Sequence, residues 1–273
     1  MVINGEILLL CERMEMAKFL HVYLQYLFRQ GLSLPQVQFL NFRSLEQLVE
    51  LAERLPRIAG SEQVRRVVVF ADAQEDLDNR NNVILDVRSS AFFGTREQCA
   101  HFFFPGRQAG HRWLNGYLED LLLATLKKEA SEGNDFHNQI NMAREYLVSV
   151  EQMRKIVREE AAFECAMAKS AFVANNASEM DKDKWHKSEA GRELCNNMGR
   201  ERVKQSSINS KAYQFTASDY KLTNPSRHLL YAFFAGTEKY VGCSLAEAAK
   251  LGAFNFENVR FTELKKCLLG LGK

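Results

Sequence analysis

The sequence predicts an α/β protein with a mainly parallel sheet, flanked by helices, and with a helical insertion. Short apolar runs alternate with amphipathic helical patterns through the first half of the chain, which is typical of βαβ units. A long helical pattern over 138–172 and a polar stretch over 175–211 follow. We therefore expect an α/β core at 1–129, a helical and polar insertion at 130–223, and a helical part at 224–273 that completes the core.

Four apolar runs carry the expected strands. They lie at 6–11, 37–42, 67–71 and 100–104. Each run is short and mainly apolar, as strands are when helices cover both faces of a parallel sheet. The third run, Val67-Val68-Val69-Phe70-Ala71, is the clearest because β-branched residues favour strands.

Amphipathic spacing and capping residues predict the helices. Ser44 is a suitable N-cap for the second of them, and Ser244 with Glu247 forms a capping-box pattern near the C-terminus. Helices are expected near 16–27, 45–55, 82–87, 114–128, 225–234, 244–250 and 261–268.

Composition limits the classes of function. Hydrophobic residues make up 46% of the chain and the formal net charge is +2, which indicates a folded core and no strong field toward nucleic acid or membrane. The sequence shows neither a signal-peptide pattern nor an apolar run near the roughly 18 residues of a membrane helix. The six cysteines are scattered without a Cys-x-x-Cys pair, which favours reduced thiols over zinc or disulfides. We therefore expect a cytoplasmic protein with no membrane partner.

Acidic residues follow two of the expected strands. Glu12 comes directly after the first strand and Asp72 after the third, with Glu75 and Asp76 in the next turn. Ligands of open parallel sheets bind outside the carboxyl ends of the strands, and carboxylate oxygens suit Mg²⁺. The alternative is structural, because an acid in this position also caps the following helix or interacts with its dipole.

The segments that hold these acids resemble the Toprim pattern. They are Leu9-Leu10-Cys11-Glu12-Arg13-Met14-Glu15 and Phe70-Ala71-Asp72-Ala73-Gln74. The Toprim pattern has a glutamate, usually followed by glycine, after the first strand and an Asp-x-Asp motif after a later strand. Toprim domains occur in topoisomerases, primases and overcoming-lysogenization-defect nucleases. Over residues 5–128 and 224–273 the chain is similar to a group of uncharacterised bacterial Toprim-related proteins.

The resemblance implies roles for particular residues. Glu12 would be the catalytic general acid or base, and Asp72 would share catalysis and bind Mg²⁺. Glu75 or Asp76 would supply a further metal ligand. A Toprim-like core with these residues would act on phosphodiesters.

Two positions depart from the Toprim pattern. Arg13 stands where glycine is usual, and we expect it to pair with Glu12 and compete with a metal. Gln74 stands where the second aspartate would be, so that one negative charge is lost. These departures favour a degenerate acidic site.

Three further groups of charged residues are candidates for a functional role. Arg107 and Arg112 lie in a glycine-containing loop after the fourth strand and are candidate phosphate-binding residues. Glu119 is expected on a helix surface, with a supporting role in the site as the alternative. Residues 182–212 hold eight Lys or Arg and four acids, an excess of 8 − 4 = +4. This segment has the charge to bind nucleic acid. The simpler interpretation is that this segment and the loop with Arg107 and Arg112 are exposed to solvent and have no ligand.

Three functional hypotheses remain. The first is a Toprim-like protein with a degenerate site that binds a nucleic acid, a nucleotide or a protein. The alternative is a Mg²⁺-dependent nuclease that uses Glu12 and Asp72. The third is a phosphoacceptor or phosphatase-type protein that uses Asp72 alone, but the fourth strand lacks the lysine or threonine that this chemistry needs. The helical pattern at 138–172 packs on the domain or forms a homo-oligomer, and the sequence leaves both open.

Overall fold

The computed structural model describes residues 2–106, 113–128, 136–150, 152 and 224–271. The chain divides into two compact units. The first consists of Met1–Asn134 with Cys243–Lys273 and holds the sheet, and the second is Asp135–Gly242. The described part of the second unit is mainly helical.

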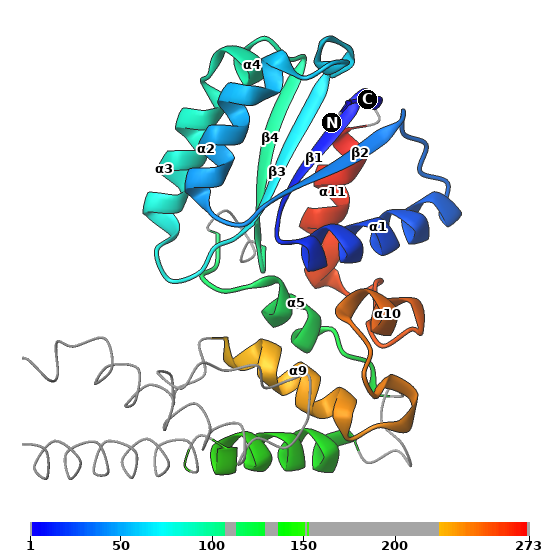
Figure 1. Cartoon of the computed structure of the whole chain (residues 1–273). Coiled ribbons are helices and arrows are strands. Elements are labelled where there is room, and N and C mark those ends of the chain that lie inside the picture. The colour runs from blue at the N-terminus through cyan, green and yellow to red at the C-terminus, as the bar shows by residue number, and fades with distance from the viewer. Residues whose placement is uncertain (1, 107–112, 129–135, 151, 153–223, 272–273) are drawn as a thin grey trace, which may run out of the picture. The chain divides into compact units, whose positions relative to one another are not determined.

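A four-stranded sheet forms the centre of the first unit. Its strands are β1 (Ile7–Glu12), β2 (Val37–Phe42), β3 (Arg66–Asp72) and β4 (Gln98–Phe104). They are arranged in the order β2-β1-β3-β4, and every neighbouring pair is parallel (Figure 1). The α/β class with a parallel sheet is therefore confirmed, and the architecture is consistent with a Toprim-like fold.

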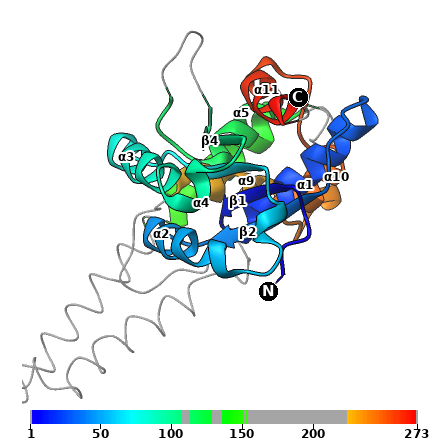
Figure 2. The ribbon, with the colours of Figure 1, turned by 90° about the horizontal axis from the view of Figure 1, so that it is seen from above.

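Helices cover both faces of this sheet. One face carries α2 (Leu45–Arg54), α3 (Leu77–Arg88) and the short α4 (Ala91–Gly94). The opposite face carries α1 (Met14–Arg29) and α11 (Thr262–Gly270), as Figures 1 and 2 show from two directions. This cover explains why β1 is buried at every position and β3 at all but its first.

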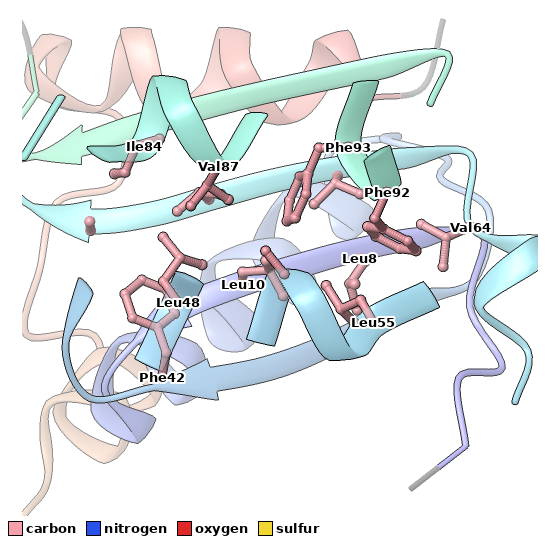
Figure 3. Packing of buried hydrophobic residues seen from close by; sticks show 14 of the residues in the cluster. Leu8, Leu10, Phe42, Leu48, Leu55, Val64, Ile84, Val87, Phe92 and Phe93 are labelled. Carbon is pink, nitrogen blue, oxygen red and sulfur yellow. The ribbon is translucent and has the colours of Figure 1, made fainter. Parts of the chain in front are cut away.

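The α2–α3–α4 face holds a core of interlocking aliphatic and aromatic side chains (Figure 3). Leu8 and Leu10 of β1 point to this face because alternate residues of a strand share a side of the sheet. They pack with Phe42 at the end of β2, Leu48 of α2 and Ile84 of α3. These side chains are all at most 1% exposed.

The opposite face is built largely from aromatic rings that are distant in sequence. The rings of Phe19 and Phe254 meet edge to face with centroids 6.4 Å apart, and Tyr23 stacks on Phe261 at 5.1 Å. The C-terminal partners belong to the segment that includes α10 (Leu245–Lys250) and α11. The last part of the chain therefore completes the core around α1.

The second unit contains a helix over 136–150 and α9 (Pro225–Ala235). Phe136 and Phe233 link them with ring centroids 5.9 Å apart. The Asn224 side chain caps α9 by accepting from the Arg227 backbone N–H at 2.9 Å. The expected helix at 138–172 is thus present as far as it is described, and its remainder, the polar stretch at 175–211 and the basic segment at 182–212 lie outside the described residues.

Two helices differ in extent from the sequence prediction. The helix expected at 114–128 is α5 (Leu118–Ala124). It starts later because Gly116, with φ 136°, pairs with Gln74 in a bridge where each backbone N–H donates to the other residue's carbonyl. Conversely, α3 starts at Leu77, before the expected residue 82, because the Asp76 side chain caps it.

The sequence composition led to expectations about the cysteines and about membrane helices. Cys11, Cys99 and Cys243 are free thiols. Every helix in the described ranges is too short or too polar to span a bilayer.

Two glycines with left-handed backbone provide a matched test of the fold. Gly60 has φ 85° and a Cβ there would lie 1.8 Å from the Ile3 carbonyl oxygen, whereas Gly31 has φ 91° and open space around it. We expect Gly31→Ala to cost about 1–2 kcal/mol through backbone strain alone. Gly60→Ala should cost at least about 2 kcal/mol more, because the segment at Ile3 must move. Denaturant unfolding measures both, and equal losses would contradict the packing at Gly60.

Candidate functional site

The candidate site lies at the carboxyl ends of the two central strands. Glu12 is the last residue of β1 and Asp72 is the last residue of β3. The chain leaves β1 for β2 on one side and then returns past β1 to β3, so the strand order reverses between β1 and β3. Ligand sites of open α/β sheets lie at such switch points.

The two acids lie together, as their positions in the sequence predict. Glu12 Oε2 accepts a hydrogen bond from the Asp72 backbone N–H at 2.9 Å. Both residues are nearly inaccessible, with exposures of 4% and 1%. Their carboxylates therefore need partners within the protein.

Arg13 supplies the first of these partners. Its Nη2 lies 2.5 Å from Asp72 Oδ2, and its Nη1 lies 3.2 Å from Glu119 Oε1. The expected pairing of Arg13 with Glu12 is therefore wrong. Arg13 lies at the turn from β1 into α1, and its guanidinium bridges β3 and α5.

Arg80 of α3 supplies the partner for Glu12. Its Nη2 lies 2.5 Å from Glu12 Oε2, and its Nε donates to the Asp72 carbonyl at 2.8 Å. Gln74 Nε2 donates to the other oxygen of Glu12 at 3.4 Å. Arg80 thus ties α3 to the ends of both central strands.

Glu119 is a buried member of this network. It was expected on a helix surface, but it is 0% exposed and pairs with Arg13. It lies in the first turn of α5, where the Leu118 N–H donates to Asp72 Oδ1 at 2.7 Å. The turn at Gly116 directs the start of α5 toward the strand ends, so that the glutamate faces inward.

Three carboxylates face two guanidiniums in this network, so one negative charge remains uncompensated. The pKa of Asp72 is raised to about 7: burial raises it most, Arg13 opposes this, and Glu119 and Glu12 add to the rise. Burial disfavours the charged form of Arg13, but the neighbouring Asp72 and Glu119 outweigh that effect and raise its pKa. Asp72 therefore keeps its proton to a much higher pH than an exposed aspartate does.

The backbone at two departures from the Toprim pattern is left-handed. Arg13 has φ 78° and ψ 143°, and Gln74 has φ 55°. The Arg13 conformation is in a region used almost only by glycine, and a side chain there costs about 1–3 kcal/mol. The buried ion pairs of Arg13 hold the residue in this conformation.

The remaining predicted site residues have different surroundings. Glu75 is exposed, and the Asp76 carboxylate accepts from the Asn79 N–H at 3.4 Å as the cap of α3. Within the described ranges, no group of three or more His, Cys, Asp or Glu is arranged to hold a metal ion. Arg107 and Arg112 lie outside the described residues.

Sequence reasoning missed Arg80. The residue shares one helical face with Ile84 and Val87, and these three are the buried residues of α3. A cation at i with apolar residues at i+4 and i+7 indicates an inward-facing charge that needs an acid. That spacing was available in the sequence, whereas the identity of the acid depends on the strand order.

Comparisons of the chain with protein-family models, with curated proteins and with solved structures found no match.

The ion pair between Arg80 and Glu12 predicts a large effect on stability. Arg80→Met leaves a buried carboxylate without its cation and should lower the free energy of unfolding by about 3–5 kcal/mol. The matched control is Arg65→Met, because Arg65 is exposed and lies 3.9 Å from Glu6 and 4.0 Å from Glu97. The control should change stability by at most about 1 kcal/mol. Similar losses in the two variants, measured by denaturant unfolding, would contradict the buried pairing.

The raised pKa of Asp72 predicts a dependence of stability on pH. Between about pH 4 and pH 7, Asp72 is protonated in the folded state and ionised in the unfolded state. Stability from this group should therefore be present at acid pH and fall as the pH rises toward 7. Asp72→Asn cannot titrate, so its free energy of unfolding should lack this fall. Parallel pH profiles of the two proteins would show that Asp72 does not hold the proton.

Proposed function

We propose that this chain is a Toprim-like binding protein whose acidic site no longer supports Mg²⁺-dependent cleavage of phosphodiesters. The position of Arg13 carries the proposal, because its guanidinium contacts Asp72 at 2.5 Å and Glu119 at 3.2 Å. Mg²⁺ takes oxygen ligands in near-octahedral geometry, and one or two protein carboxylates usually hold it. An arginine already bound to those oxygens opposes the metal by charge and by volume.

The backbone of Arg13 supports the link to the Toprim pattern. A φ of 78° with a ψ of 143° suits glycine, and glycine is what the pattern has at this position. The chain therefore combines a glycine-type turn with an arginine side chain. We infer that the turn comes from a metal-binding arrangement and that the arginine replaces the cation.

The proposed partner is a nucleic acid, a nucleotide or a protein that binds outside the strand ends. The basic loop with Arg107 and Arg112 follows β4, and the basic segment at 182–212 adds a second source of positive charge. Phosphate groups are the natural ligands of such arginines. A cytoplasmic location and self-association through 138–172 belong to the same proposal.

A second candidate is a Mg²⁺-dependent nuclease. One observation favours it: the carboxylates of Glu12, Asp72 and Glu119 belong to one connected network. The Arg13 side chain is 25% exposed, so a rotation toward solvent would leave the oxygens of Asp72 and Glu119 open to a metal. Substrate binding would have to drive that rotation.

Titration with Mg²⁺ or Mn²⁺ separates the two candidates. We expect no calorimetric binding to the natural chain at millimolar metal and no cleavage of DNA or RNA. Arg13→Gly removes the guanidinium and suits the backbone, so the variant should gain metal binding. With about 10 mM metal and a Kd of about 1 mM, its free energy of unfolding would rise by roughly 1.4 kcal/mol.

Two controls make the titration decisive. Arg13→Lys keeps a cation and should not gain metal binding, and Arg13→Gly combined with Asp72→Asn should lose the gain. Circular dichroism first establishes that each variant folds. Metal binding and cleavage by the natural chain, both abolished in Asp72→Ala, would refute the binding-protein proposal and favour the nuclease.

A further inference from the structure

A cavity separate from the acidic site lies between α1, α10 and the segment that follows α10. Its volume is about 480 Å³, which falls within the range of small-molecule sites. Figure 1 shows α1 and α10 side by side, and the view in Figure 2 agrees. We call it the α1–α10 cavity, and the residues that matter for its chemistry are Tyr26, Arg29, Lys127, Lys250, Phe256 and Glu257.

The charge in the α1–α10 cavity is predominantly positive. Arg29, Lys127 and Lys250 line it, and none of them forms an ion pair with a residue that the structure describes. Glu257 is the only acid in the lining, and its carboxylate accepts a hydrogen bond from the Tyr26 hydroxyl. Three cations against one acid favour a ligand with at least two negative charges.

The helix dipole accounts for part of this arrangement. Arg29 and Lys250 each lie in the last turn of a helix, where a cation is stabilised whatever its surroundings. Lys127 lies outside a helix, and its backbone N–H donates to the Ala253 carbonyl at 2.8 Å, which fixes it beside the cavity. Dipole stabilisation does not explain why all three cations line the same cavity.

Aromatic side chains provide the apolar part of the lining. Tyr26 and Phe256 are half-buried and their ring centroids lie 5.1 Å apart at 53°. The buried Phe254 adjoins them. Aromatic surface beside unpaired cations is the combination that binds a planar base together with its phosphates.

We propose that the α1–α10 cavity binds a mononucleotide, with Lys127, Lys250 and Arg29 at the phosphates and Tyr26 and Phe256 at the base. The site shares no residue with the network of Arg13, Asp72 and Glu119. The inference therefore does not depend on the function proposed for that network.

Calorimetric titration of the full chain with ATP in the presence of EDTA tests this proposal. EDTA removes metal, so the acidic network cannot contribute through a cation. Adenosine carries the base without phosphates, and tripolyphosphate carries the charge without the base. ATP should bind at least about ten-fold more tightly than either fragment, because only ATP uses both parts of the lining.

Two substitutions that change the net charge of the lining in opposite directions identify the site. Lys127→Gln should weaken ATP binding by about five-fold, and Glu257→Gln should strengthen it by a similar factor. The matched control is Lys18→Gln, because Lys18 is an exposed residue of α1 that does not line the cavity. It should leave the affinity for ATP unchanged.

Several results would overturn the proposal. These are no ATP binding at millimolar concentration, tripolyphosphate binding as tight as ATP, or ATP binding that is the same in all three variants. Thermal unfolding of each variant establishes that it is folded. If Lys127→Gln lowers stability without changing ATP affinity, the lysine is structural and the proposal fails. A single-stranded oligonucleotide that binds while ATP does not would also reject a mononucleotide site.

Discussion

Two guanidiniums hold three buried carboxylates together at the ends of the central strands, and the surrounding structure depends on these ion pairs. Arg80 connects α3 to β1, and Arg13 connects the start of α1 to β3 and α5. A buried carboxylate without a cation is strongly destabilising. The network therefore fixes where five helices and strands meet, in a region where apolar packing alone would leave charges without partners.

The same ion pairs occupy the oxygens that a metal-dependent reaction would use. A metal-dependent site keeps its acids available to the ion, whereas Asp72 and Glu119 here are engaged by Arg13, and Glu12 by Arg80. The strained backbone of Arg13 is retained because the ion pairs outweigh it. A metal ion at these oxygens would therefore have to displace the arginines.

The sequence predicted much of the fold because each strand has a local signal. The runs of β1, β2, β3 and β4 are short and apolar, and alternation with helices implies a parallel sheet. The meeting of Glu12 with Asp72 followed from that topology. Which arginine pairs with which acid did not follow from the topology. These pairings depend on φ at Arg13 and on the bridge at Gly116 that turns Glu119 inward. Such long-range geometry has no local pattern.

The division of the sheet's cover between distant parts of the chain has a consequence for synthesis on the ribosome. The side covered by α2, α3 and α4 is complete once β4 has emerged, whereas Phe19 and Tyr23 wait for rings supplied by Phe254 and Phe261. Until those rings have been synthesised, the nascent chain carries an exposed aromatic surface. Translation arrest between these segments would therefore yield a product that aggregates or needs a chaperone.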